Sequence, residues 1–381
     1  MIEIDLVGGE VLLPSGLETT RLTVAAGHIA DAPAGREADL SGYRILPGII
    51  DVHGDGFERH MAPRRGAMKQ MNDGIVAAEA EIAANGITTA VLAQFVSWEG
   101  GLRSLDFADQ VFGAMIATRD DVVTDLRPQL RFETHMLDLY ADLPARIADW
   151  QVGYVVFNDH LPHDRLAEGR KPPRLTGQAL KAGRNPDAHF QMLLEMHASG
   201  SEVPGALDRL CAALKAQGVH LGSHDDHSAS QRAEWHERGA SVAEFPETSE
   251  AAEAAHRDGD LVVLGAPNVV RGGSHKGNAS ALDLIAMGLC DAIASDYHYP
   301  SPRRAALMLA KSGVMALGGA WAFVSSGPAA VLGLTDRGTL TPGKRADLVV
   351  LDDRDRVAAT LSGGRVSYMS GDIAGRFLGA G

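Results

Sequence analysis

Short apolar runs alternate with helical patterns through the middle of this 381-residue chain. The runs are bounded by polar or turn-forming residues and predict strands, and apolar residues recurring every three or four positions predict helices between them. The predicted strands cover residues 45–52, 88–93, 129–133, 153–157, 220–222, 241–243, 261–264 and 292–294. The predicted helices include residues 72–84, 188–198, 205–217, 249–258 and 280–287. This alternation predicts an α/β fold, namely a (β/α)8 TIM-like barrel.

The two ends of the chain have a different pattern from the middle. Residues 1–45 contain short alternating strands separated by turns, and residues from 341 onward contain more strand-like runs. We therefore expect both ends to meet in one small β-sandwich domain, built from residues 1–45 and 341–381, beside a barrel of residues 46–340. The stretch 164–185, rich in Arg, Lys, Pro and Gly, is predicted to be a long loop over the barrel mouth.

A His-x-Asp pair follows the first predicted barrel strand. His53 and Asp55 are two residues apart, and residues i and i+2 of a strand point to the same side. One imidazole and one carboxylate at the end of a buried strand form half of a typical divalent-metal site in a hydrolase. The alternatives are a helix cap and a buried histidine bonded to a neighbouring carboxylate.

Further nitrogen and oxygen ligands stand near the ends of later predicted strands, where barrel enzymes place their catalytic residues. They are Glu133, His160, His224 and Asp296. Asp225 and Asp226 directly follow one of these histidines and are candidates to orient its ring.

Two of these carboxylates have alternative roles. Glu133 could form an ion pair with Arg131, but strand alternation places both on one face with His135, which favours Glu133 as a ligand and His135 as a lesser candidate. Asp296 could cap the next helix. The Pro-containing segment after it delays that helix and favours a role beside a metal ion, where a carboxylate can take the proton of an attacking water.

A Gly-rich basic segment is the strongest candidate for binding anions. Glycines expose backbone N–H groups, and basic side chains add positive charge. The candidate substrate contacts are Arg271, Gly272, Gly273, His275 and Lys276, with Arg64 from a second basic cluster soon after the His-x-Asp pair. A flexible turn and solvated surface charge are the alternatives.

Composition limits the class of protein. The net charge of −14 disfavours nucleic acid and anionic membranes as partners, and the sequence has no apolar run of about eighteen residues that would predict a membrane span. Cys211 and Cys290 are the only cysteines. Together with an acidic N-terminus unlike a signal peptide, this predicts a cytoplasmic location.

These residues resemble the amidohydrolase superfamily, and within it a diphosphatase branch. The resemblance spans most of the chain, and its longest string runs from Gly265 to Asn278. The other strings are Pro47 to His53, His53-x-Asp55-x-x-x-x-His60, Ser223-His224-Asp225-Asp226, Glu244-Phe245-Pro246-x-Thr248, Ser295-Asp296-Tyr297, and Gly338 to Leu348.

The resemblance implies a metal-dependent hydrolase that releases pyrophosphate from a phosphorylated sugar in phosphonate metabolism. It implies metal ligands at His53, Asp55, Glu133, His160, His224 and Asp296, which bind one or two divalent ions: Zn, or alternatively Mn or Fe. A small phosphorylated sugar is then the partner, and we expect a homo-oligomer. In the implied mechanism a metal-activated hydroxide attacks phosphorus, with Asp296 positioning or deprotonating the water.

Two glycines depart from the pattern of that branch, because Gly54 and Gly56 stand where Thr and Asn are expected. The hydrolase class is therefore better fixed than the phosphorylated substrate. A metal-dependent amide or cyclic-amide hydrolase on the same barrel is the first alternative. A catalytically silent barrel with an assembly or regulatory role is the second.

Overall fold

A computed structural model describes residues 1–62, 70–272 and 279–379. The chain forms two compact units. The first contains Met1–Leu92, Thr118–Arg127 and Leu261–Gly381, and the second contains Ala93–Ala117 and Pro128–Asp260.

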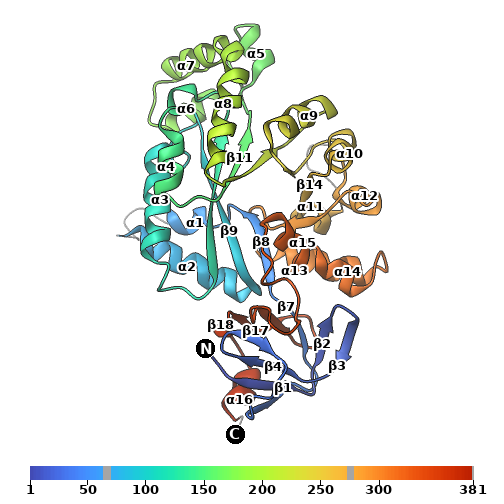
Figure 1. Ribbon diagram of the computed structural model, residues 1–381. Coiled ribbons are helices and arrows are strands. Elements are labelled where there is room, and N and C mark those ends of the chain that lie inside the picture. The colour runs from blue at the N-terminus through green and yellow to red at the C-terminus, as the bar shows by residue number, and fades with distance from the viewer. Residues whose placement is uncertain (63–69, 273–278, 380–381) are drawn as a thin grey trace. The chain divides into compact units, whose positions relative to one another are not determined.

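Both ends of the chain contribute to two small sheets in the first unit. One sheet has the order β5-β4-β1-β6 and the other β18-β17-β16-β7-β2-β3; in Figure 1 the blue N-terminal strands lie beside the red C-terminal ones. Their bounds are Ile4–Val7 (β1), Glu10–Leu13 (β2), Gly16–Thr19 (β3), Leu22–Ala25 (β4), His28–Ala30 (β5), Glu37–Asp39 (β6), Arg44–Pro47 (β7), Leu348–Leu351 (β16), Val357–Ser362 (β17) and Arg365–Met369 (β18). Apolar side chains of both sheets share one core with helix α16 (Ile373–Leu378). The predicted β-sandwich of both termini is confirmed.

Eight strands form the barrel sheet in the order β15-β14-β13-β12-β11-β10-β9-β8. Their bounds are Ile49–Gly54 (β8), Ile87–Val96 (β9), Asp125–Glu133 (β10), Tyr154–Asn158 (β11), His220–His224 (β12), Val242–Glu244 (β13), Leu261–Gly265 (β14) and Ala292–Ala294 (β15). A parallel bridge from Gly54 to Asp296 links the first strand to the loop after the last. Every residue of β8 and β9 is buried, as expected of parallel strands covered on both faces. The predicted (β/α)8 barrel is confirmed.

Some of the helices have clear capping residues. Helix α10 runs over Ser249–Asp258, as predicted; Thr248 Oγ1 accepts from the Ala251 amide at its start, and Gly259 ends it with φ 80°. In the first unit the other helices are α1 (Glu58–Met61), α2 (Met71–Ala84), α11 (Ala266–Arg271), α12 (Ala281–Ala286), α13 (Ser301–Lys311), α14 (Leu317–Ala322) and α15 (Ser326–Val331). In the second they are α3 (Leu105–Ala117), α4 (Leu143–Asp149), α5 (His163–Ala167), α6 (Leu175–Lys181), α7 (Pro186–Ala198), α8 (Val203–Ala216) and α9 (Ala229–Arg238). Among the described residues, none of the helices has both the length and the apolar character that a membrane crossing requires.

The predicted long loop over residues 164–185 is wrong. This stretch contains most of α5 and all of α6. Two of its leucines, Leu166 and Leu175, are buried in a small cluster with Trp98, Leu161 and Leu193. Widely spaced apolar residues among many charges are enough to fix two short helices once a neighbouring apolar surface is available.

The single strand predicted over residues 45–52 is also wrong. Strand β7 ends at Pro47 and belongs to the terminal sheet, and β8 begins at Ile49 in the barrel. Gly48 lies between them, and a Cβ there would stand 2.4 Å from Thr88 Oγ1. Only glycine therefore fits where the chain passes from one sheet to the other.

A buried arginine connects three segments of the first unit. Arg337 donates to Asp125 Oδ2 at 2.7 Å and to Thr89 Oγ1 at 2.8 Å, and its guanidinium is 3.8 Å from Asp347. Burial would raise the pKa of Asp125, but the guanidinium groups of Arg127 and Arg337 outweigh it and hold that pKa below its usual value. Removing the cation would leave Asp125 with Arg127 at 3.0 Å and Asp347 with Arg345 at 3.0 Å.

We predict that Arg337→Met lowers the free energy of unfolding by about 1.5–3 kcal/mol, because the charged hydrogen bonds of Arg337 are lost while Arg127 and Arg345 still compensate the two carboxylates. Arg356→Met is the matched control, since Arg356 forms an exposed ion pair with Asp352, and should stay close to wild type. Urea denaturation of the three proteins measures the difference. Equal stability of the two variants would contradict the structural role of Arg337.

Candidate active site

Three of the predicted ligands meet at the ends of β8 and β15. His53 is buried within β8, Asp55 follows that strand, and Asp296 lies two residues past β15. The Asp296 amide donates to the His53 carbonyl at 3.0 Å, and the Asp55 amide donates to the Asp296 carbonyl at 2.8 Å. Asp296 has a φ of 56°, a conformation that Asp tolerates better than most residues. The backbone therefore holds an imidazole and two carboxylates at one end of this strand pair.

The carboxylate of Asp51 holds the end of β15 next to β8. Asp51 is fully buried on β8; its Oδ1 accepts from the Ser295 amide at 2.8 Å and its Oδ2 accepts from the Ser295 hydroxyl at 2.5 Å. Burial raises the pKa of Asp51 to about 6, against the lowering effect of the two Ser295 hydrogen bonds. Asp51 thus positions the residue directly before Asp296.

Steric crowding explains why position 54 is a glycine. A Cβ at Gly54 would lie 2.8 Å from Asp51 Oδ2, 2.9 Å from Ser295 Oγ and 3.0 Å from the Tyr299 ring. The close approach of the Asp51–Ser295 pair therefore excludes a side chain between His53 and Asp55. The departure from the Thr expected at this position is a consequence of local packing.

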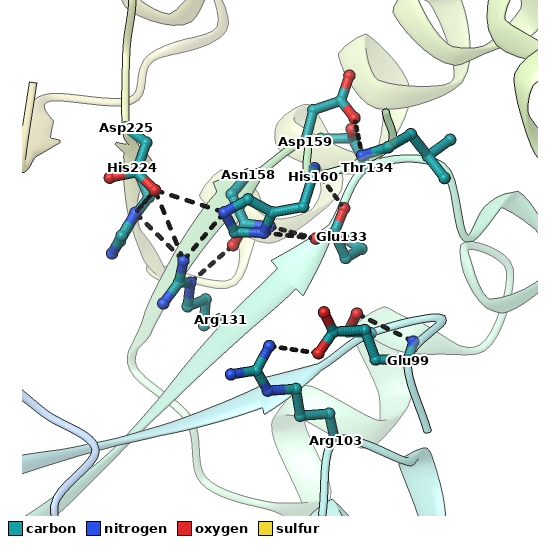
Figure 2. A network of polar contacts seen from close by, with 12 residues as sticks. Glu99, Arg103, Arg131, Glu133, Thr134, Asn158, Asp159, His160, His224 and Asp225 are labelled. Atoms are coloured by element: carbon teal, nitrogen blue, oxygen red, sulfur yellow. Dashed lines mark hydrogen bonds and ion pairs between the residues drawn. The ribbon is translucent and has the colours of Figure 1, made fainter. Parts of the chain in front are cut away.

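In the second unit, Glu133 at the end of β10 contacts His160. Glu133 Oε1 accepts from Asn158 Nδ2 at 2.7 Å and lies 2.8 Å from His160 Nδ1, and Oε2 accepts from the His160 amide at 3.1 Å (Figure 2). Burial raises the pKa of Glu133. Burial lowers that of His160, but hydrogen bonds to Asp225 and Glu133 outweigh it and raise the pKa to about 9. Carboxylate contacts of this kind orient metal-binding imidazoles.

Arg131 and Asp225 extend this group to His224. Arg131 donates to Asn158 Oδ1 at 2.8 Å, and its NH2 group lies 3.3 Å from His224 Nδ1; Figure 2 shows it between the two histidines. Asp225 Oδ2 is 3.1 Å from His224 Nδ1 and 3.4 Å from His160 Nε2. Burial would raise the pKa of Asp225, but the charge on His224 and the bonds from both histidines hold it well below its usual range.

These contacts decide between earlier alternatives. Arg131 is not in a surface ion pair with Glu133, since both side chains bond to Asn158. Asp225 contacts His224 as expected, whereas Asp226 accepts from the Ser223 hydroxyl at 2.6 Å and pairs with the buried Arg232. Sequence order alone does not separate two adjacent carboxylates that point to different neighbours.

Glu244 is a site residue that the sequence patterns did not single out. It ends β13 and is fully buried. Its Oε1 accepts from Gln129 Nε2 at 3.0 Å and from the Tyr154 hydroxyl at 2.7 Å. A carboxylate oxygen of Glu244 lies within 4.8 Å of a ring nitrogen of His224. The sequence signal that could have identified it is its position at the end of the predicted strand 241–243, because Glu133 also stands at the end of a predicted strand.

The predicted shared face of Arg131, Glu133 and His135 is only partly right. Strand β10 ends at Glu133, so the alternation of side chains does not continue to His135. The His135 ring instead approaches Asp159, with 3.5 Å between Nδ1 and Oδ1. His135 belongs to a different cluster of side chains.

The basic segment is described only at its start. Arg271 is the last residue of α11, and its guanidinium donates to the Tyr297 hydroxyl and, at 2.6 Å, to Asn268 Oδ1. Gly272 follows with φ 76°, and its amide donates to the carbonyls of Asn268 and Val269 at 3.2 Å. That amide is therefore occupied by the helix end. The other predicted contacts lie outside the described residues: Arg64, Gly273, His275 and Lys276.

Comparison with known proteins places the chain in a family. It belongs to the amidohydrolase family: that family's model matches residues 185–368, and a relative aligns over nearly the whole chain. The relative is the alpha-D-ribose 1-methylphosphonate 5-triphosphate diphosphatase of Escherichia coli (strain K12), 31% identical over 366 residues that cover 93% of this chain and 94% of that protein. The chain is therefore a metal-dependent hydrolase close to that enzyme.

Solved structures share the fold at low sequence identity. The beta-aspartyl dipeptidase of Fervidobacterium islandicum AW-1 is 13% identical, with a TM-score of 0.64 over 97% of this chain and 99% of that one. The N-acetylglucosamine-6-phosphate deacetylase of Pasteurella multocida is 11% identical, with a TM-score of 0.64 over 96% and 99%. These similarities concern the fold, because function on one fold varies with the site.

We predict that Asp51→Ala destabilises the protein and lowers its metal affinity. The substitution leaves the buried Ser295 amide and hydroxyl without their acceptor, at about 1–3 kcal/mol each, and frees the loop that carries Asp296. Asp51→Asn keeps one acceptor oxygen and should fall between wild type and Asp51→Ala. Thermal unfolding and Zn²⁺ titration measure both effects. Wild-type metal affinity in a folded Asp51→Ala protein would show that Asp51 does not position this loop.

Proposed function

We propose that this chain hydrolyses alpha-D-ribose 1-methylphosphonate 5-triphosphate and releases pyrophosphate. The main support is the near-full-length similarity to the Escherichia coli enzyme of that name. A second support is local, because Arg271 contacts the residue next to Asp296 through the Tyr297 hydroxyl. A guanidinium held by the loop that carries the proposed catalytic carboxylate suits a substrate with several phosphate oxygens.

The donor set fits a divalent transition metal. Neutral imidazole and carboxylate are borderline ligands that suit Zn, Mn or Fe, and the proposed ligands are His53, Asp55, Glu133, His160, His224 and Asp296. For Glu133 the proposed donor is Oε2, because Oε1 contacts both Asn158 and His160. When bound, a divalent ion supplies Lewis acidity and lowers the pKa of a water ligand. Its binding at His160 requires loss of the proton favoured there by Asp225 and Glu133.

Different side chains transfer the proton, bind the phosphate oxygens and position the ligands. Asp296 orients the attacking water and accepts its proton, which places negative charge on the attacking oxygen as the phosphorus–oxygen bond to the leaving group breaks. Arg271 binds phosphate oxygens and stabilises the charge that develops on the departing pyrophosphate. Glu133 holds the His160 ring through Nδ1, and Nε2 becomes available to a metal when its 3.4 Å contact with Asp225 is given up. The Gly272 amide takes no part because it closes α11.

The first prediction concerns turnover. Metal-loaded wild-type protein should release pyrophosphate from the ribose triphosphate, and Asp296→Asn should lower kcat by about 100-fold or more, because a positioned general base contributes about 10²–10⁴ to the rate. The metal content of each protein is measured alongside pyrophosphate release. A metal-loaded wild type without release would contradict the substrate, whereas an active Asp296→Asn variant with its metal in place would contradict the proposed role of Asp296.

The second prediction concerns anion recognition. Arg271→Met should raise KM for the triphosphate at least about tenfold, because a charged hydrogen bond contributes about 1.5–3 kcal/mol. Arg365→Met is the control, since Arg365 is an exposed arginine on β18 of the terminal sheet. Tyr297→Phe tests the hydroxyl that holds the guanidinium and should have a smaller effect. A mild effect of Arg271→Met together with amide hydrolysis by the wild type would favour the amidohydrolase alternative.

A further inference from the structure

A second group of possible metal ligands lies in the second unit, apart from the proposed catalytic set. His135 follows β10, Asp159 follows β11, and His163 begins α5. One ligand atom from each lies within 4.8 Å of the other two. His163 Nε2 is 2.8 Å from Asp159 Oδ2, and His135 Nδ1 is 3.5 Å from Asp159 Oδ1. Ligands of one tetrahedral zinc ion, each bound at about 2.0–2.2 Å, lie about 3.3–3.6 Å apart. The His135–Asp159 separation fits this geometry, whereas the 2.8 Å hydrogen bond from His163 to Asp159 has to open by about 0.5 Å to admit an ion.

A third histidine fixes the orientation of His163. His197, near the end of α7, has its Nδ1 atom 2.9 Å from His163 Nδ1. Without an ion, His163 Nε2 donates to Asp159 Oδ2 at 2.8 Å, so a bound metal has to displace this proton. A proton on Nδ1, donated to His197, then leaves the Nε2 lone pair for the metal. This is the tautomer in which Nε2 can bind a metal, and such a hydrogen bond to the other ring nitrogen is typical of metal-binding histidines.

The cluster is buried on one side and accessible to solvent on the other. His135 is only 7% exposed, His163 and His197 are half-buried, and Asp159 is exposed at the strand end. The rings of His135 and His163 have centroids 4.9 Å apart, and those of His163 and His197 5.2 Å apart. Three protein ligands leave a fourth tetrahedral position for water or an exogenous ligand.

The cluster is separate from the residues around His160. Figure 2 shows the Asp159 carboxylate directed away from the His160 ring, although the two residues are adjacent. Asp159 Oδ1 also accepts from the Leu161 amide at 3.0 Å, which fixes this direction. The Thr134 hydroxyl lies 3.3 Å from His135 Nδ1, and rotation about one side-chain bond releases that contact. The ends of β10 and β11 thus carry two separate groups of side chains, one around His160 and the other around Asp159.

We propose that His135, Asp159 and His163 bind a divalent transition ion such as Zn²⁺, with His197 holding His163 in the required tautomer. This ion is additional to those of the proposed hydrolysis and does not depend on it. Its ligands come from the segments after β10 and β11, so it joins α5 to the ends of two barrel strands.

The test counts metal in the full-length protein after equilibration with Zn²⁺ and removal of loosely bound ions. His163→Ala should lose one equivalent relative to wild type, and so should His135→Ala. His256→Ala is the control, because His256 is an exposed histidine on α10, and should keep the wild-type count. His197→Ala should keep the site but weaken its Zn²⁺ affinity about 10- to 100-fold. If His135→Ala does not fold, His163→Asn replaces it.

A second arm separates the cluster from the catalytic set. The double variant His53→Asn, His224→Asn removes two proposed catalytic ligands and should still bind one Co²⁺ with a visible absorption spectrum, which disappears when His163→Ala is added. An unchanged metal count in folded His163→Ala protein, or no Co²⁺ bound by the double variant, would overturn the proposal. Because both readouts count ions, a failed diphosphatase assay leaves them unaffected.

Discussion

A buried carboxylate pairing holds the first and last strands of the barrel in register. Asp51 accepts two hydrogen bonds from Ser295, and the parallel bridge from Gly54 to Asp296 lies just beyond. The penalty for burying Asp51 is visible in its raised pKa, and the two bonds offset it only while Ser295 stays in place. The lack of a side chain at Gly54 and the strained backbone of Asp296 both follow from this close approach.

Much of the fold could be predicted because the hydrophobic pattern is regular where burial is complete. The run at residues 292–294 and the capped helix at 249–258 coincide with β15 and α10. The pattern failed where one apolar run contributes to two sheets. The run continues from Pro47 to Ile49 without a polar residue, but these two residues lie in different sheets. It also failed at residues 164–185, where packing against Trp98 and Leu193 forms helices that local composition does not predict.

The candidate site was predictable in its residue types and less so in its contacts. His53, Asp55 and Asp296 come together because parallel strand ends bring distant segments side by side. The prediction failed where strand alternation was extended past the end of β10, because this placed His135 on one face with Glu133. Glu244 stands in one of the resembling strings but was not proposed as a ligand, because its place is set by long-range contacts with Gln129 and Tyr154. Only tertiary structure supplies such information.

The shared terminal sheet has a consequence for how the chain is made. Strands β2, β3 and β7 are translated well before β16, β17 and β18, which complete the same sheet. Strand β7 pairs directly with β16, so its edge stays open until about 300 further residues have been translated. Completion of this sheet therefore has to wait for the synthesis of β16. Until then the edge of β7 that will face β16 is open to mispairing with other strands.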